Sequence, residues 1–188
     1  SIPRLTAKLA ASNAGAVFAQ PVPFEGPSGL CYGIVGVIWR LHHLISLQTP
    51  KLSGELCAIR TACLRPIPEN IATDEPYIEL SIHRQGCSIV YMPESVVNIR
   101  CPTAIVDLFK QRKRIWVGHM QLQNETGFKV STSSFGNVIH RLSKLSISEI
   151  FCLTLGAFLE ATAYIQAKTE VKKGAIPYAW EPIKSTKT

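Results

Sequence analysis

The sequence has no C-x-x-C pair, no internal repeat and no low-complexity segment. The missing cysteine pair argues against a zinc site of the usual spacing, although the chain contains six cysteines. Most of these cysteines lie in apolar runs, where a free thiol behaves as a small core residue. We therefore expect free thiols and a reducing, cytoplasmic setting. No secretory signal peptide is recognised at the start of the sequence.

Acidic residues are scarce relative to basic ones, with 13 Asp and Glu against 20 Lys and Arg and a net charge of +7. This excess favours anionic partners, among them nucleotide phosphates, nucleic acid and an acidic membrane surface. The three tryptophans are scattered and form no stacking platform, so nucleic acid is not the expected partner. Charge alone does not choose between the other two.

Uninterrupted hydrophobic runs of transmembrane length are also missing. The stretch 30–47 contains an arginine and two histidines, and the stretch 146–167 contains Glu149 and Glu160. We expect a buried or interfacial helix in the first stretch, and in the second a helix that packs on the protein or lies on a membrane surface. Apolar residues make up 46% of 188 residues, which is enough for one domain with its own core.

Strand-like and helical patterns alternate along the chain, which predicts an α/β fold with a mixed sheet of few strands and flanking helices. The predicted strands cover 15–20, 54–60, 88–91 and 95–99, the last two separated by a turn at Pro93-Glu94. Predicted helices cover 4–12 and 30–47, and two more begin at Thr73 and Thr103.

A carboxylate pair, Asp74-Glu75, stands at the predicted start of the helix that follows Thr73. Thr73 is a suitable N-cap, and Ile78 and Ile82 form the buried stripe of this helix. A carboxylate in a cleft can accept the proton of an attacking hydroxyl group. Acids in a first helical turn also complement the helix dipole without any catalytic role.

Basic and aromatic residues come together in the segment 111–116, Gln-Arg-Lys-Arg-Ile-Trp, inside a second predicted helix. Gln111 and Arg114 lie three residues apart and share a face of this helix. The planar guanidinium of arginine suits the oxygens of a diphosphate. The alternatives are a solvated basic helix or one that lies on acidic lipid.

The order of these motifs resembles the C-terminal half of a family 2 glycosyltransferase domain. Thr73-Asp74-Glu75 stands for the family's T-E-D with the acids exchanged, and register with Gly86 places Glu75 at the catalytic base. Asp74 is its immediate neighbour, and which of the two acids is the base stays open.

The same resemblance implies substrate-binding roles elsewhere in the chain. Gln111, Arg114 and Trp116 stand for the family's Q-x-x-R-W, here with Ile115 inserted before the tryptophan. The segment that contains Gly54, Glu55 and Arg60 resembles the loop and strand beside the acceptor pocket.

The implied activity is transfer of a sugar, with inversion, from a nucleotide-sugar donor to a lipid, sugar or polymer hydroxyl. A divalent metal, Mg²⁺ or Mn²⁺, is implied, with ligands outside these residues. The fold would be an incomplete GT-A-like unit, with residues 1–145 as its acceptor-side part and 146–188 as a helix and tail packed on it or on a membrane. The donor-nucleotide half would be missing, so we expect the isolated chain to be inactive. The alternative is a non-catalytic basic module that binds a membrane surface or a partner chain. For either function the expected location is cytoplasmic or peripheral on the inner face of the membrane.

Overall fold

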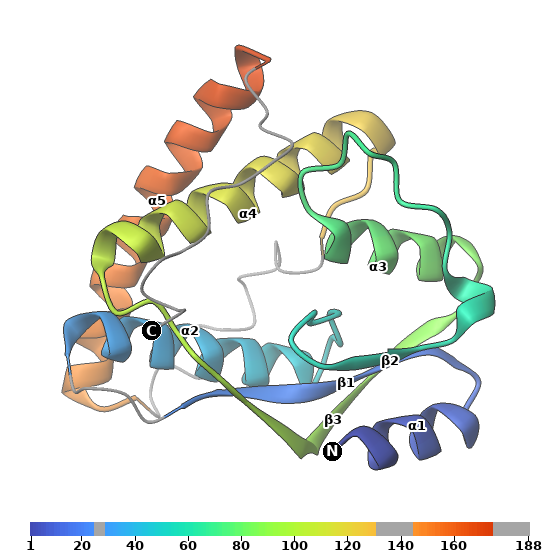
Figure 1. Ribbon diagram of the computed structural model, residues 1–188. Coiled ribbons are helices and arrows are strands. Elements are labelled where there is room, and N and C mark those ends of the chain that lie inside the picture. The colour runs from blue at the N-terminus through green and yellow to red at the C-terminus, as the bar shows by residue number, and fades with distance from the viewer. Residues whose placement is uncertain (25–28, 131–144, 175–188) are drawn as a thin grey trace.

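The computed structural model describes residues 1–24, 29–130 and 145–174 and shows helices packed around a small sheet (Figure 1). The end of the predicted tail, 175–188, lies outside the described residues. The elements in chain order are α1 (Ile2–Ala10), β1 (Ala14–Pro23), α2 (Leu30–Ser46), β2 (Cys57–Ile59), the short 3-10 helix η1 (Thr61–Cys63), α3 (Asp74–Arg84), β3 (Ser88–Ile99), α4 (Ile105–Thr126) and α5 (Ile147–Lys172).

The sheet is mixed and has three strands in the order β2-β1-β3. β2 pairs antiparallel with β1, and β3 pairs parallel with β1. Phe18 of β1 lies between Cys57 of β2 and Tyr91 of β3. The predicted α/β class, with few strands and flanking helices, is confirmed.

β1 is the centre of the core because both of its faces are covered. Phe18 packs with Ile82 of α3 on one face, and Val17 packs with Leu5 of α1 on the other. All four of these side chains are fully or almost fully buried. Burial on both faces explains why the strand reads as a continuous apolar run instead of an alternating one.

The predicted turn at Pro93-Glu94 is wrong. The structure has one strand, β3, across this segment, and its pairing with β1 jumps from Ala19↔Met92 to Gln20↔Val96. The skipped residues form an irregularity of the β-bulge kind, where the extra residues leave the ladder. A proline tolerates such a position because it has no N–H to donate.

Two helix starts also differ from expectation. Thr73 is the N-cap residue of α3, but its hydroxyl makes no capping hydrogen bond, and its Oγ1 is buried with no partner among the described residues. Its side chain instead packs against Gly118 of α4. α4 begins at Ile105 with Ala104 as N-cap, one residue later than a cap at Thr103 would place it.

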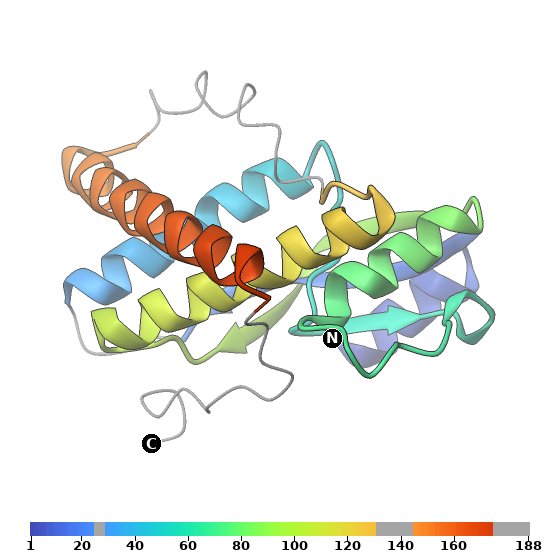
Figure 2. The same ribbon diagram turned by 90° about the horizontal axis from the view of Figure 1, so that it is seen from above.

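α5 lies across α2 and α4 (Figure 2). Apolar contacts join Leu159 of α5 to Ile34 of α2 and Leu108 of α4. A capping box starts the helix, in which Ser146 accepts from the Glu149 amide and Glu149 accepts from the Ser146 amide. α5 therefore packs on α2 and α4.

We expect Gly118→Ala to lower the free energy of unfolding by about 1–3 kcal/mol, because a Cβ there forces α4 and α3 apart. That Cβ would stand 2.1 Å from Thr73 Oγ1 and 2.5 Å from its Cγ2. Gly36→Ala is the matched control, since it is also helical and its Cβ would meet nothing within 4 Å. The control should be neutral or stabilising by about 0.5–1 kcal/mol. Urea unfolding of both variants checks this, and equal midpoints would contradict the close contact.

Candidate active site

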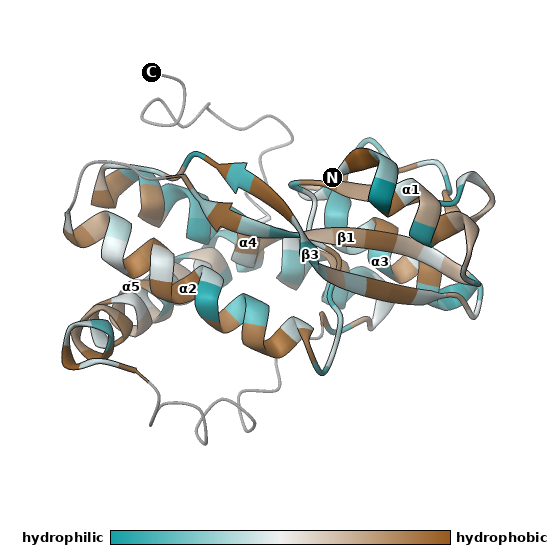
Figure 3. Ribbon diagram, turned by 90° about the horizontal axis from the view of Figure 1, so that it is seen from below, coloured by the Kyte–Doolittle hydropathy of each residue, from teal (hydrophilic) through white to brown (hydrophobic). Residues whose placement is uncertain are grey.

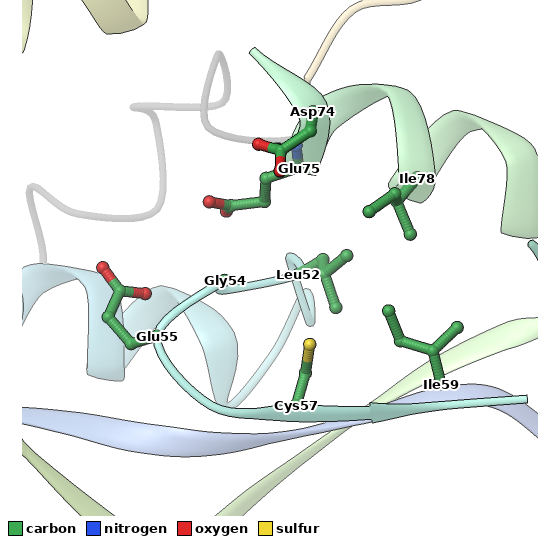
Figure 4. A pocket seen from close by; sticks show the side chains of 8 residues that line it. All are labelled: Leu52, Gly54, Glu55, Cys57, Ile59, Asp74, Glu75 and Ile78. Atoms are coloured by element: carbon green, nitrogen blue, oxygen red, sulfur yellow. The ribbon is translucent and has the colours of Figure 1, made fainter. Parts of the chain in front are cut away.

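A pocket of about 380 Å³ opens between the start of α3 and the loop before β2. Asp74 and Glu75 come from α3, and Gly54 and Glu55 come from the loop, so the structure brings these four predicted site residues together. In Figure 4 the carboxylates occupy one side of the pocket and apolar side chains the other. The apolar wall consists of Leu52, Cys57, Ile59 and Ile78.

Main-chain amides of the loop hold two carboxylates of α3. The Leu52 N–H donates to Glu79 Oε2 at 3.2 Å, and the Gly54 N–H donates to the Glu75 carboxylate. Glu75 and Glu79 are four residues apart and so lie on one face of the helix. Residues 52–54 thus fasten the loop to the first turns of α3 and place Glu75 at the pocket wall.

Gly54 permits this approach. A Cβ at this position would stand 3.0 Å from Glu75 Oε2, tighter than ordinary contact. In the structure the glycine lets the backbone approach Glu75.

Burial is the main reason that the pKa of Glu75 rises from its ordinary 4.5 to about 7. The neighbouring carboxylates of Glu55 and Glu79 raise it further, while Lys51 and the Gly54 amide act against the rise. A carboxyl group with a pKa near neutrality can both take and release a proton at physiological pH.

Lys51 lies next to these acids and was not identified from the sequence. Burial lowers the pKa of its ammonium, and the charges of Glu75 and Glu79 oppose that change. Arg112 of α4 is close enough to lower the Lys51 pKa as well. A single lysine after Pro50 has no motif around it, so no sequence signal marks it.

Two histidines next to Lys51 and Arg112 are held neutral. Burial, followed by the charges of Lys51 and Arg112, lowers the pKa of His42 to about 4 and that of His119 to about 3. The ring of His42 packs edge-on against Trp39 at 5.2 Å, and its Nδ1 is buried without a partner among the described residues. His42 comes from α2 and His119 from α4, and both lie near Lys51 and Arg112 only in the folded chain.

The adjacent histidine, His43, has a different environment. His43 Nδ1 lies 2.7 Å from the hydroxyl of Tyr91. Burial raises the pKa of Tyr91 to about 12, so the phenol stays protonated at neutral pH. The pair thus links α2 to β3 through His43, while His42 faces the buried basic group.

The predicted residues of α4 lie apart from the pocket. Gln111 is half-buried, Arg114 is exposed, and neither they nor Trp116 are among the described residues that line the pocket. Trp116 Nε1 donates to Glu160 Oε2 of α5 at 2.7 Å. Arg112, within the same motif, forms an ion pair with Glu160. The side of the motif that carries Arg112 and Trp116 therefore contacts α5.

Arg60, also predicted to bind substrate, is engaged in the fold. Its guanidinium donates to the carbonyl oxygens of Leu9 at 3.0 Å, Ser12 at 2.9 Å and Ala14 at 3.2 Å. These bonds fasten the connection between α1 and β1 to the end of β2. Arg60 is not among the described residues that line the pocket.

Within the described part of the chain, no group of three or more His, Cys, Asp or Glu side chains could hold a metal ion. These residues therefore do not fit the divalent metal that the resemblance implies, and its ligands outside the chain stay a prediction. All six cysteines have free thiols.

No family model matches the chain, and no curated protein matches it. The resemblance to family 2 glycosyltransferases therefore stays a prediction. What the pocket can do has to be argued from its own geometry and charges.

We expect Glu75→Gln to change the pH dependence of stability. Because the folded-state pKa of Glu75 is raised from 4.5 to about 7, the native state keeps a proton that the unfolded chain releases. This contribution is fully present below about pH 4.5 and is lost as the pH rises through about 7. Glutamine is neutral at every pH. From about pH 5 to about pH 8, the free energy of unfolding of the variant should therefore rise relative to that of the wild type by about 2 kcal/mol.

Urea unfolding of both proteins at the two pH values measures this difference. Parallel pH profiles for the variant and the wild type would show that Glu75 titrates normally in the folded chain.

Proposed function

We propose that this chain forms the acceptor side of a sugar-transfer site in an incomplete GT-A-like unit. The observation that carries the proposal is the buried carboxyl group of Glu75, with a pKa of about 7, at the wall of a pocket. Such a group can deprotonate a hydroxyl as that hydroxyl becomes the nucleophile. The apolar wall opposite the acids suits the hydrophobic face of a sugar ring or the chain of a lipid acceptor.

In the proposed reaction Glu75 takes the proton of the acceptor hydroxyl. The acceptor oxygen forms a bond to the anomeric carbon from the side opposite the leaving group, so the configuration inverts. The bond between that carbon and the nucleoside diphosphate breaks, and the diphosphate leaves with the electron pair. Asp74 would orient Glu75 or an acceptor group, as its place beside Glu75 in the pocket lining supports.

The leaving diphosphate needs positive charge near the acids. Lys51 lies beside Glu75 and Glu79, and Arg112 is close enough to Lys51 for their charges to interact. We assign the leaving group to Lys51 and Arg112 in preference to Arg114, which is exposed on the same helix. A divalent metal bound outside these residues would supply further positive charge to the diphosphate. The nucleotide-binding half of the donor site would likewise lie outside them.

A non-catalytic accessory module is the second candidate. It is favoured by the contacts of the basic segment of α4 with α5, where Arg112 and Trp116 both contact Glu160. Lys113 contacts Glu170 of α5 at 2.7 Å. Contacts of this kind would give the segment a packing role without any ligand.

The kinetic test uses the protein extended by the residues encoded immediately upstream, assayed with a panel of sugar nucleotides. Glu75→Gln keeps the shape of the side chain and removes the proton acceptor, so turnover should fall by about 10²–10⁴-fold while nucleotide affinity changes little. Asp74→Asn should lower turnover by a smaller factor. If Asp74→Asn is the more damaging change, the two acids exchange roles. If neither slows turnover, the accessory module is favoured.

The choice between the two arginines has its own test. Arg112→Gln should weaken binding of the nucleoside diphosphate by about 10-fold or more, since a charge-assisted bond is lost. Arg114→Gln, two residues further along α4 and exposed, is the matched control and should leave the affinity unchanged. Isothermal titration calorimetry measures both. Thermal unfolding confirms that loss of the Glu160 ion pair has not unfolded Arg112→Gln. If Arg114→Gln weakens binding more than Arg112→Gln does, Arg114 is the residue that contacts the leaving group.

A further inference from the structure

α5 has its acids turned toward the protein, the reverse of an ordinary surface helix. All three of its glutamates form ion pairs with cations of the helices beneath it. The pairs are Glu149 with Arg40 of α2, Glu160 with Arg112 of α4, and Glu170 with Lys113 of α4.

Bulky apolar side chains occupy the opposite, outward side of α5. Ile147 is 89% exposed, Phe151 60%, Phe158 71% and Ile165 62%. The inward side includes the small residues Gly156 and Ala163, which are buried. In Figure 3 hydrophobic residues recur along the ribbon of α5.

The exposed apolar side chains of α5 form a continuous row, whereas the exposed hydrophobic residues of a soluble protein are usually scattered singly. Among the described residues, α5 is the one helix long and apolar enough to cross a membrane, and only 22% of its most apolar window is buried in the protein. From Ile147 to Ile165 the face is about 27 Å long at 1.5 Å per residue. This length is close to the roughly 30 Å hydrocarbon thickness of a bilayer.

Charge on the exposed part of α5 is of one sign. Lys168, Lys172 and Lys173 are exposed at its C-terminal end, while its acids are paired inward. Ionisable groups on lipid-facing helices characteristically turn toward the protein and pair there. Lysines at the end of such a helix reach the level of the lipid headgroups.

We propose that the outward face of α5 lies in the acyl region of a bilayer that contains anionic lipid, with its three C-terminal lysines among the headgroups. The bilayer offers both the apolar medium for Phe151 and Phe158 and the negative charge for the lysines. A second copy of the chain would offer no acid on this face to pair with the lysines. The inference is independent of sugar transfer, because the outward face contains no residue of the pocket or of the proposed leaving-group site.

Vesicle flotation tests the proposal. The 188-residue chain is synthesised in a cell-free system with vesicles of phosphatidylcholine, alone or mixed with phosphatidylglycerol. We expect it to float with the mixed vesicles. The double substitution Phe151→Ser and Phe158→Ser should lower partitioning at least about tenfold, since two large apolar side chains leave the acyl region. Ile2→Ser, at an exposed apolar residue of α1, is the matched control and should leave partitioning unchanged.

Substitution of Lys168, Lys172 and Lys173 by Gln should remove the preference for phosphatidylglycerol and lower partitioning into mixed vesicles by on the order of 100-fold at low salt.

Three outcomes would overturn the proposal. One is a chain that floats with neither vesicle. Another is flotation that survives the double serine substitution. The third is a soluble dimer, detected by sedimentation velocity, that becomes a monomer on the double serine substitution, which would assign the face to a second copy of the chain.

Discussion

The structure depends on ionisable side chains that are buried beside α3. Loop amides at Leu52 and Gly54 bind Glu79 and Glu75, and Lys51 lies in the same buried group. Removing a carboxylate from water disfavours its charged form unless partners compensate. Glu79 is fully buried, whereas Glu75 meets the pocket and has a pKa near neutrality. One helix face thus contains a buried acid that anchors the loop and an acid poised to exchange a proton.

α4 joins this buried group to the outer helix. Arg112 interacts electrostatically with Lys51 and forms an ion pair with Glu160 of α5. His119, two turns further along α4, is neutral because it is buried near the same two cations. The basic segment of α4 therefore serves both the packing of α5 and the electrostatics of the pocket. A shift of α5 would change the ion pair between Arg112 and Glu160.

Much of the fold was predictable because local patterns marked it. The apolar run at 15–20 and the helix start at Thr73 are local signals, and both elements formed where expected. The segment 93–95 was misread because proline usually ends a strand, and only pairing with β1 shows that it is a bulge within β3. The sequence also could not show that the Thr73 hydroxyl makes no capping hydrogen bond. Gly118 lies 45 positions away in the chain and contacts Thr73 only through packing.

By itself the sequence determined the α/β class and the excess of positive charge, because these follow from short-range pattern and from composition. The structure brings Asp74-Glu75 and Gly54-Glu55 to one pocket, whereas the sequence grouped them only through a resemblance that stays a prediction. Only the tertiary structure decided that Lys51, His42 and His119 surround Arg112, that Arg60 binds backbone carbonyls and that the acids of α5 face inward. The physical reason is that a pKa, an ion pair and an exposed face depend on distance and desolvation, which residues far apart in the chain acquire only when they pack.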